Sequence, residues 1–234
     1  MTTKRQIKKL LQPIAERHQD VILLDYCVVL MPLRHVVRSI WIARCLNADR
    51  FRPLCIVAHM FAYSGHASGA NSDIFPISED VHWRHGDPKA ADELLTIFES
   101  AKLPFLKEME NLDAFLKQTR IPPPSGPSYF GRDRYRNFLR EVGAGDFAAA
   151  LRLYGDGIDM SGWICPRDHP AVQQHYADVQ AAIDRLAPLV AAGDRGGVGD
   201  VLREMERVTA RKMRMEHLWE PTPFPFEADE QAVG

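Results

Sequence analysis

Charged side chains interrupt an apolar run at residues 34–46, which reads RHVVRSIWIARCL. Side chains alternate between the two faces of a strand, so Arg38 and Arg44 share one face of a predicted strand here. If the loop NADR closes a hairpin, His59 of the next strand lies opposite Arg38, and Tyr26 joins this face from the preceding strand. A forked arginine beside histidine and tyrosine suits a carboxylate or phosphate. The sequence therefore predicts a ligand- or partner-binding face at Arg38, His59, Arg44 and Tyr26.

An alternative interpretation makes the same face the ordinary wet side of a sheet, with arginine stems lying over apolar neighbours. A one-residue change of register would also move every side chain to the other face. We expect Arg38 to lie partly exposed in a shallow groove shaded by residues 64–90, because an isolated buried charge is strongly unfavourable. The opposite face, with Val37, Trp41 and Met60, suits burial under a helix.

The segment HWRH holds the best candidate metal ligands, His82 and His85. Two histidines three residues apart can converge on an ion in a helix, and Glu79, Asp80 and Asp87 stand nearby. No second pair of ligands with matching spacing accompanies them, and a single His-x-x-His is a weak signal. The sequence therefore predicts surface histidines here, with no metal and no cofactor.

Other motifs point to packing more than to chemistry. No Gly-x-Ser-x-Gly nucleophile turn is present. GDRGGVGD follows a predicted helix and lacks the Gly-Lys-Ser/Thr ending of a phosphate loop, so it predicts a turn between helices. RDRYRNFLR mixes arginine with aromatic residues, as nucleic-acid-binding segments do. Its Tyr135, Phe138 and Leu139 fall on one helical stripe, which favours a packed helix with a basic outer face.

The composition is typical of a globular protein: 234 residues, 46% hydrophobic, 26% charged, with a net charge of −2. The balance of 29 basic and 31 acidic residues argues against general nucleic-acid binding. No apolar run is long enough for a membrane span, and no targeting signal stands at the N-terminus. The four cysteines form no Cys-x-x-Cys pair, which is typical of reduced thiols. We therefore expect a cytoplasmic protein with no membrane partner.

Hydrophobic spacing predicts an α+β fold with a small antiparallel sheet, a three-stranded meander or larger. The expected strands are 21–31, 35–46 and 51–63. A long excursion at 64–90 is expected to hold one more short strand or helical turn near Phe75 or Trp83. The expected helices are 3–18, 90–98, 105–118, 132–142, 146–154, 168–191 and 198–216, with a break at the SAK that follows residue 99.

Prolines divide the chain into two expected parts. Residues 1–120 form the α+β part with the meander, 121–130 a proline-rich connector, and 131–234 a helical subdomain. Prolines keep the segment LWEPTPFPFE from being helical throughout, and its Trp219, Phe224 and Phe226 are expected to hold it on the body.

Two helix-turn segments carry a resemblance. LREVGAGDFAAALRLY at 139–154 resembles the turn of a tetratricopeptide-type helix pair, and LVAAGDRGGVGDVL at 189–202 resembles it more weakly. A solenoid needs three or more units, so this resemblance implies a repeat-like helical subdomain and no repeat array. The meander around MPLRHVVRSIWIAR, together with LWEPTPFPFE, is similar to a group of uncharacterised bacterial proteins, and that resemblance implies no activity.

These patterns favour a non-enzymatic cytosolic protein-binding module whose partner is another protein. The alternative is a metal-assisted hydrolase that uses the 64–90 loop over the face of Arg38 and His59. No motif supplies a nucleophile, a base and a stabilising group together. This absence favours the binding module over the hydrolase.

Overall fold

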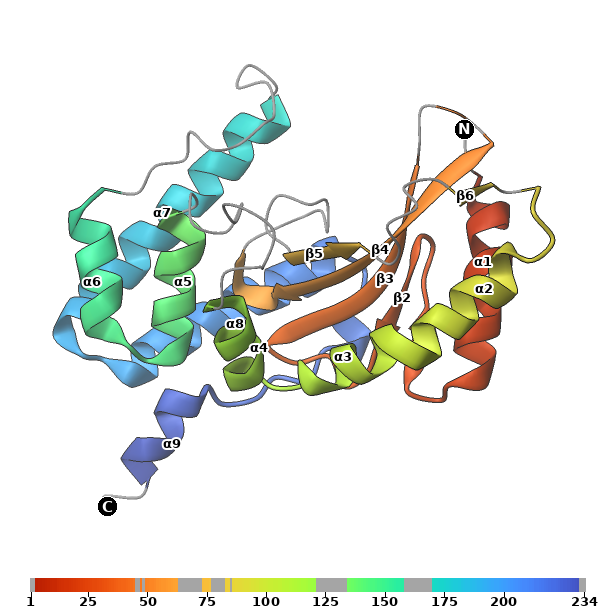
Figure 1. Cartoon of the computed structure of the whole chain (residues 1–234). Coiled ribbons are helices and arrows are strands. Elements are labelled where there is room, and N and C mark those ends of the chain that lie inside the picture. The colour runs from red at the N-terminus through yellow and green to blue at the C-terminus, as the bar shows by residue number, and fades with distance from the viewer. Residues whose placement is uncertain are drawn as a thin grey trace.

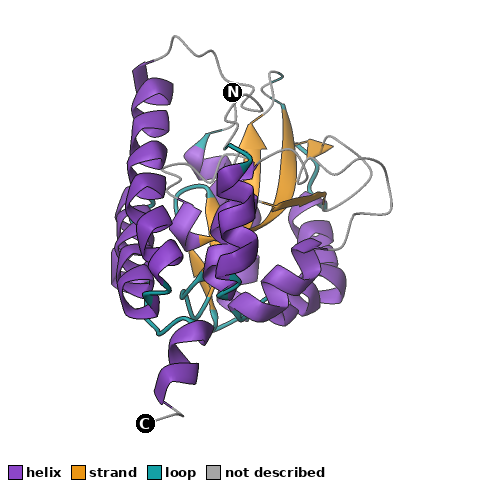
Figure 2. Ribbon diagram, turned by 90° about the vertical axis from the view of Figure 1, so that its left-hand side faces the viewer, coloured by secondary structure: helices purple, strands orange, loops and turns teal. Residues whose placement is uncertain are grey.

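The computed structural model describes residues 3–44, 47, 49–62, 73–76, 83–84, 86–120, 134–157 and 170–231. The fold is α+β, as the sequence predicts: an antiparallel sheet has helices on both faces and a group of helices at one end (Figure 1). In the perpendicular view of Figure 2 the strands lie between helices on the two sides.

The sheet follows the order β1-β2-β3-β4-β5, and β6 also pairs with β4. Its strands are β1 Val21–Leu23, β2 Cys27–Leu30, β3 Val36–Arg44, β4 Arg50–His59, β5 Asp73–Pro76 and β6 Trp83–Arg84. The expected strand at 21–31 is wrong, because a turn closed by the Leu24 N–H and the Cys27 carbonyl (2.8 Å) divides it in two. The further strand expected near Phe75 or Trp83 is confirmed, at both places.

The register between β3 and β4 differs by two residues from the expected one. Val36 pairs with His59, and Arg38 pairs with Val57. The hairpin closes earlier than expected, with Arg44 opposite Phe51. A shift of two residues keeps every side chain on its face, so Arg38 and His59 still share one side of the sheet, now as diagonal neighbours.

Helices cover the Arg38 face of the sheet at the front of Figure 1. They are α1 Lys4–Arg17, α2 Ala90–Ile97, α3 Leu103–Glu108 and α4 Leu112–Arg120. Thr3 and Gln6 cap α1 reciprocally, and Ile7, Leu10 and Leu11 lie on its buried side. The expected break at SAK is wrong: residues 98–102 continue as a π-helical turn, and Pro104 lies in the first turn of α3, where proline costs no hydrogen bond.

The remaining helices are α5 Arg134–Ala144, α6 Phe147–Gly155, α7 Pro170–Ala192, α8 Arg195–Lys212 and α9 Pro225–Gln231. The C-terminal part of α8 packs behind the sheet, where Ala210 and, beyond the helix, Met215 meet Val37 and Met60. The expected burial of that face is confirmed for Val37 and Met60, while Trp41 is half-buried. The larger core on the other face runs continuously from Ile7 to Phe226. Of the helices in the described ranges, none combines the length and apolar character needed to cross a membrane.

Residues 219–228, here named the strap, return the chain to the start of β3. Trp219 forms a parallel bridge with Leu33, whose carbonyl accepts the Glu220 N–H at 2.8 Å. Phe224 and Phe226 are buried, as their aromatic character led us to expect. A Cβ on Gly145, where φ is +76°, would lie 2.6 Å from the Phe226 Cβ. The α5–α6 turn therefore needs glycine at position 145 to leave room for the Phe226 side chain.

Candidate binding cleft

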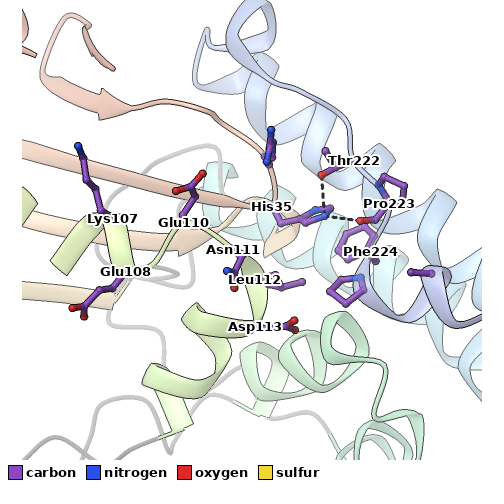
Figure 3. Close-up of a pocket in the computed structure, with 13 residues that line it drawn as sticks. His35, Lys107, Glu108, Glu110, Asn111, Leu112, Asp113, Thr222, Pro223 and Phe224 are labelled. Atoms are coloured by element: carbon purple, nitrogen blue, oxygen red, sulfur yellow. Dashed lines mark hydrogen bonds between the residues drawn. The ribbon is translucent and has the colours of Figure 1, made fainter. Parts of the chain in front are cut away.

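A cleft of about 550 Å³ lies between the strap and the turn that joins α3 to α4 (Figure 3). Its size is within the range of ligand sites in proteins. Arg34 and His35, the two residues that precede β3, complete the walls. The lining residues are Arg34, His35, Lys107, Glu108, Glu110, Asn111, Leu112, Asp113, Thr222, Pro223, Phe224, Pro225 and Ala228.

His35 joins the cleft to the core beneath it. Its Nδ1 lies 2.8 Å from Oε1 of Glu206 on α8. Its Nε2 lies 3.1 Å from the Pro223 carbonyl oxygen and 3.0 Å from the Thr222 hydroxyl, both on the strap. The ring stacks on Phe224 with centroids 4.2 Å apart. One side chain therefore binds the sheet, α8 and the strap together.

The partners of His35 define where its protons lie. A carbonyl oxygen only accepts, so Nε2 carries a hydrogen and donates it to Pro223. Nδ1 then shares a proton with Glu206, whose side chain is fully buried. Burial raises the pKa of Glu206, while His35 and the nearby Trp219 N–H lower it. Glu206 is thus held in the interior by its hydrogen bond to the His35 imidazole.

The contacts from the Thr222 hydroxyl to His35, and from His35 to Glu206, have the same order as nucleophile, base and acid in a hydrolytic triad. The Nε2 hydrogen that points at Pro223 prevents His35 from accepting the hydroxyl proton of Thr222 in this state. The Phe224 amide of the strap donates to Glu227 at 2.6 Å, so it is not available to stabilise an oxyanion. The arrangement acts as a clamp on the strap.

The rim of the cleft is mostly acidic. Arg34 is engaged by Glu220 at 3.2 Å, and Lys107 by Asp20 at 3.3 Å. These two ion pairs neutralise the positive charges of the rim. The carboxylates that line it are Glu108, Glu110 and Asp113.

Arg38 does not lie in a groove, so the expected exposure of this side chain is wrong. It is 1% exposed. One guanidinium nitrogen donates to the Leu106 carbonyl at 3.3 Å and another to the Pro32 carbonyl at 3.1 Å. Desolvation lowers its pKa. The arginine therefore ties the sheet to α3 through backbone acceptors instead of a carboxylate.

His59 is also buried, and the groove expected beside it is absent from this part of the described structure. Its ring lies 4.6 Å from that of Phe61 and 5.9 Å from that of Phe115. Neither ring nitrogen has a hydrogen-bond partner within the described ranges. Burial holds the pKa of His59 well below 6.5, and the charges of Arg140 and Arg136 lower it further.

The other expected members do not join His59. Tyr26 lies in the β1–β2 turn, where its carbonyl accepts the Ile42 N–H. Ile42 is six residues from Val36, the partner of His59, which is about 20 Å along a strand. The backbone of Arg44 pairs with Phe51, but its side chain lies outside the described residues. The candidate ligands His82 and His85 lie outside them as well.

Sequence reasoning missed the arginines whose charges act on His59. Arg136 and Arg140 of α5 are each 5% exposed, so the expected basic outer face of this helix is wrong at both positions. The Arg140 guanidinium lies 5.9 Å from the centre of the Phe115 ring. Their spacing of four residues, which places both on one helical face, was the available signal.

Metal and thiol chemistry find little support in the described ranges. No group of three or more histidine, cysteine or acidic side chains there is arranged to hold a metal ion. Cys27 and Cys55 are buried free thiols, and desolvation raises the pKa of each to about 12. Both are protonated at neutral pH and are therefore poor nucleophiles.

Comparison with known proteins gives no match: no family model, no curated protein and no solved structure resembles this chain closely enough to be assigned. The helix-pair resemblance remains a prediction, and the function has to be argued from the cleft.

Proposed function

We propose that this chain is a protein-binding module that holds an extended segment of a partner protein in the cleft beside the strap. The observation that carries the proposal is the cleft itself, about 550 Å³ between the strap and the α3–α4 turn. Its apolar residues Pro223, Pro225 and Ala228 offer contact area, and its polar rim offers hydrogen bonds. A combination of apolar floor and polar rim is usual for protein interfaces.

The charge of the rim indicates which kind of partner segment would bind there. Arg34 and Lys107 are already paired, so the carboxylates of Glu108, Glu110 and Asp113 set the sign of the surface. Complementary charge favours a segment that brings lysine or arginine side chains to this rim.

The hydrolase hypothesis receives less support. Arg38 and His59 lie beneath the covering helices, where a substrate cannot reach them. His35 is the histidine that lines the cleft, and its two nitrogens are occupied by Glu206 and the strap. Peptide binding in the cleft requires neither a free base nor a nucleophile, whereas hydrolysis would require both.

A peptide selection on the full chain tests the proposal. Random peptides are selected against the protein, and their dissociation constants are measured by fluorescence polarisation. Ala228→Trp fills the cleft and should weaken the selected peptides at least about tenfold. Ala148→Trp makes the same change on an exposed position of α6 and should leave binding unaltered.

Two further measurements make the test strict. Glu110→Gln should weaken basic peptides and reduce the dependence of their affinity on salt, because one rim charge is lost. Peptides that bind Ala228→Trp and the original chain equally well would refute the proposal, as would a selection that shows no enrichment of basic residues.

A further inference from the structure

Prolines alternate with other side chains along the strap. They stand at positions 221, 223 and 225, where each is exposed or half-buried. Between them, Thr222 is half-buried and Phe224 is fully buried. Side chains of an extended segment alternate between its two sides, so the side with Phe224 packs on the core and the side with the prolines faces outward. The strap therefore presents proline rings on its outer side.

Two of these prolines belong to the cleft. Pro223 and Pro225 line it together with Ala228, whereas Pro221 does not. A proline carries no backbone N–H, so at these two positions the strap cannot donate a hydrogen bond to a bound chain. The Pro223 carbonyl oxygen is already the acceptor for His35, at 3.1 Å. This wall therefore offers a partner rigid ring surface in place of the main-chain hydrogen bonds that an added strand would need.

The opposite wall of the cleft supplies hydrogen-bond acceptors. Glu108, Glu110 and Asp113 line it from the α3–α4 turn, and all three are exposed. In Figure 3 the carboxylate of Asp113 points toward the strap side of the cleft, whereas that of Glu108 points away from it. Within the described ranges, no hydrogen bond or ion pair engages the Asp113 side chain. A carboxylate acceptor is therefore available across the cleft from the proline rings.

An aromatic side chain with a polar hydrogen matches both walls. The negative face of an aromatic ring attracts the C–H groups of a proline ring, and proline-rich segments dock in aromatic-lined grooves in many complexes. Tyrosine and tryptophan also carry an O–H or N–H that needs an acceptor when the ring is buried. We propose that the cleft selects a tyrosine or tryptophan of the partner segment, with its ring on Pro223 and Pro225 and its polar hydrogen directed to Asp113. This inference rests on the proposed function and names the side chain that the cleft recognises.

Labelled peptides of the form Lys-x-Z-x-Lys test the inference on the full chain, where Z is tryptophan, phenylalanine or leucine and x is a random residue. Dissociation constants are measured by fluorescence polarisation. Tryptophan peptides should bind at least about threefold more tightly than leucine peptides, because ring packing adds to the burial of apolar area. Pro223→Ala should remove most of this preference. Pro221→Ala changes an exposed proline of the same strap outside the cleft, so this matched control should keep the preference.

The role of the carboxylate is tested separately. Tryptophan peptides should bind more tightly than phenylalanine peptides, because only tryptophan donates an N–H to Asp113. Asp113→Ala should abolish this difference. Asp92→Ala is the matched control, since Asp92 is an exposed acid in the first turn of α2, as Asp113 is in that of α4. An unchanged difference in Asp113→Ala would refute the assigned hydrogen bond.

A measurement on the unaltered chain does not depend on the folding of any variant. The ring current of a bound tryptophan should shift the NMR signal of the Ala228 methyl group, which lines the same cleft, and leucine peptides should shift it less. An unshifted signal, equal binding of tryptophan and leucine peptides, or a preference that Pro223→Ala leaves intact would overturn the inference while the cleft remains a peptide site. If none of the peptides binds, the proposed function fails together with it.

Discussion

Phe224→Ala tests whether the strap is part of the core. Phe224 is fully buried and packs on His35 at 4.2 Å and on Phe61 and Phe226 at 5.5 Å each. Replacing a buried phenylalanine by alanine costs about 3–5 kcal/mol, the sum of lost burial and the cavity that remains. The free energy of unfolding should therefore fall by this amount, which is a large part of the stability of an ordinary domain.

Urea unfolding followed by circular dichroism measures the loss, and thermal unfolding gives a second value. For a chain of this size about 1 kcal/mol corresponds to roughly 2–4 °C, so the melting temperature should fall by roughly 6–20 °C. Tyr154→Ala is the matched control, since this residue is 42% exposed and the loss of its ring should cost about 1 kcal/mol or less. A loss below about 1 kcal/mol for Phe224→Ala would show that the strap docks only weakly and that our account of the core is wrong.

Two further predictions concern the buried cations. Arg38→Met should lower the free energy of unfolding by about 2–4 kcal/mol, because two backbone carbonyls lose a charged donor. Arg34 is exposed, so the control Arg34→Met should cost about 1 kcal/mol or less. Equal losses of the two variants in urea unfolding would contradict this prediction. The pKa of His59 is lower in the folded than in the unfolded chain, so the unfolded state binds more protons below about pH 6.5. The stability that His59 contributes is complete above that pH and decreases on acidification, by up to about 1.4 kcal/mol per pH unit. His59→Phe should remove this slope when the free energy of unfolding is measured at several pH values below about pH 6.5.

The elements of this fold were largely predictable because they depend on local spacing. The apolar stripe of α1 and the long apolar run of β3 each carry their own signal. The errors arise where local signals compete: the chain turns after Leu23 although the run is apolar, and the helix continues through residues 98–102 although SAK suggested an end. The two-residue register difference comes from the β3–β4 loop, whose length the sequence does not define.

The candidate sites depend on contacts between distant parts of the chain, which a single sequence does not reveal. Arg38 and His59 were correctly placed on one face of the sheet. Whether that face is exposed to solvent depends on how the helices after residue 90 pack on it. The pairing of His35 with Glu206 joins residues separated by 171 positions, and no local pattern marks it. The arginines of α5 face inward for the same reason: the helix has neighbours on more than one side.

The contact between the strap and the residues just before β3 has a consequence for how the chain is made in the cell. Arg34 and Glu220 are 186 positions apart, and α8, which covers the second face of the sheet, comes shortly before the strap. A ribosome that works from the N-terminus therefore delivers the sheet long before its cover, and Val37 and Met60 stay accessible to water and to chaperones during most of synthesis. A chain whose translation stops before α8 lacks the helix that covers this apolar face, so Val37 and Met60 stay exposed in such a fragment.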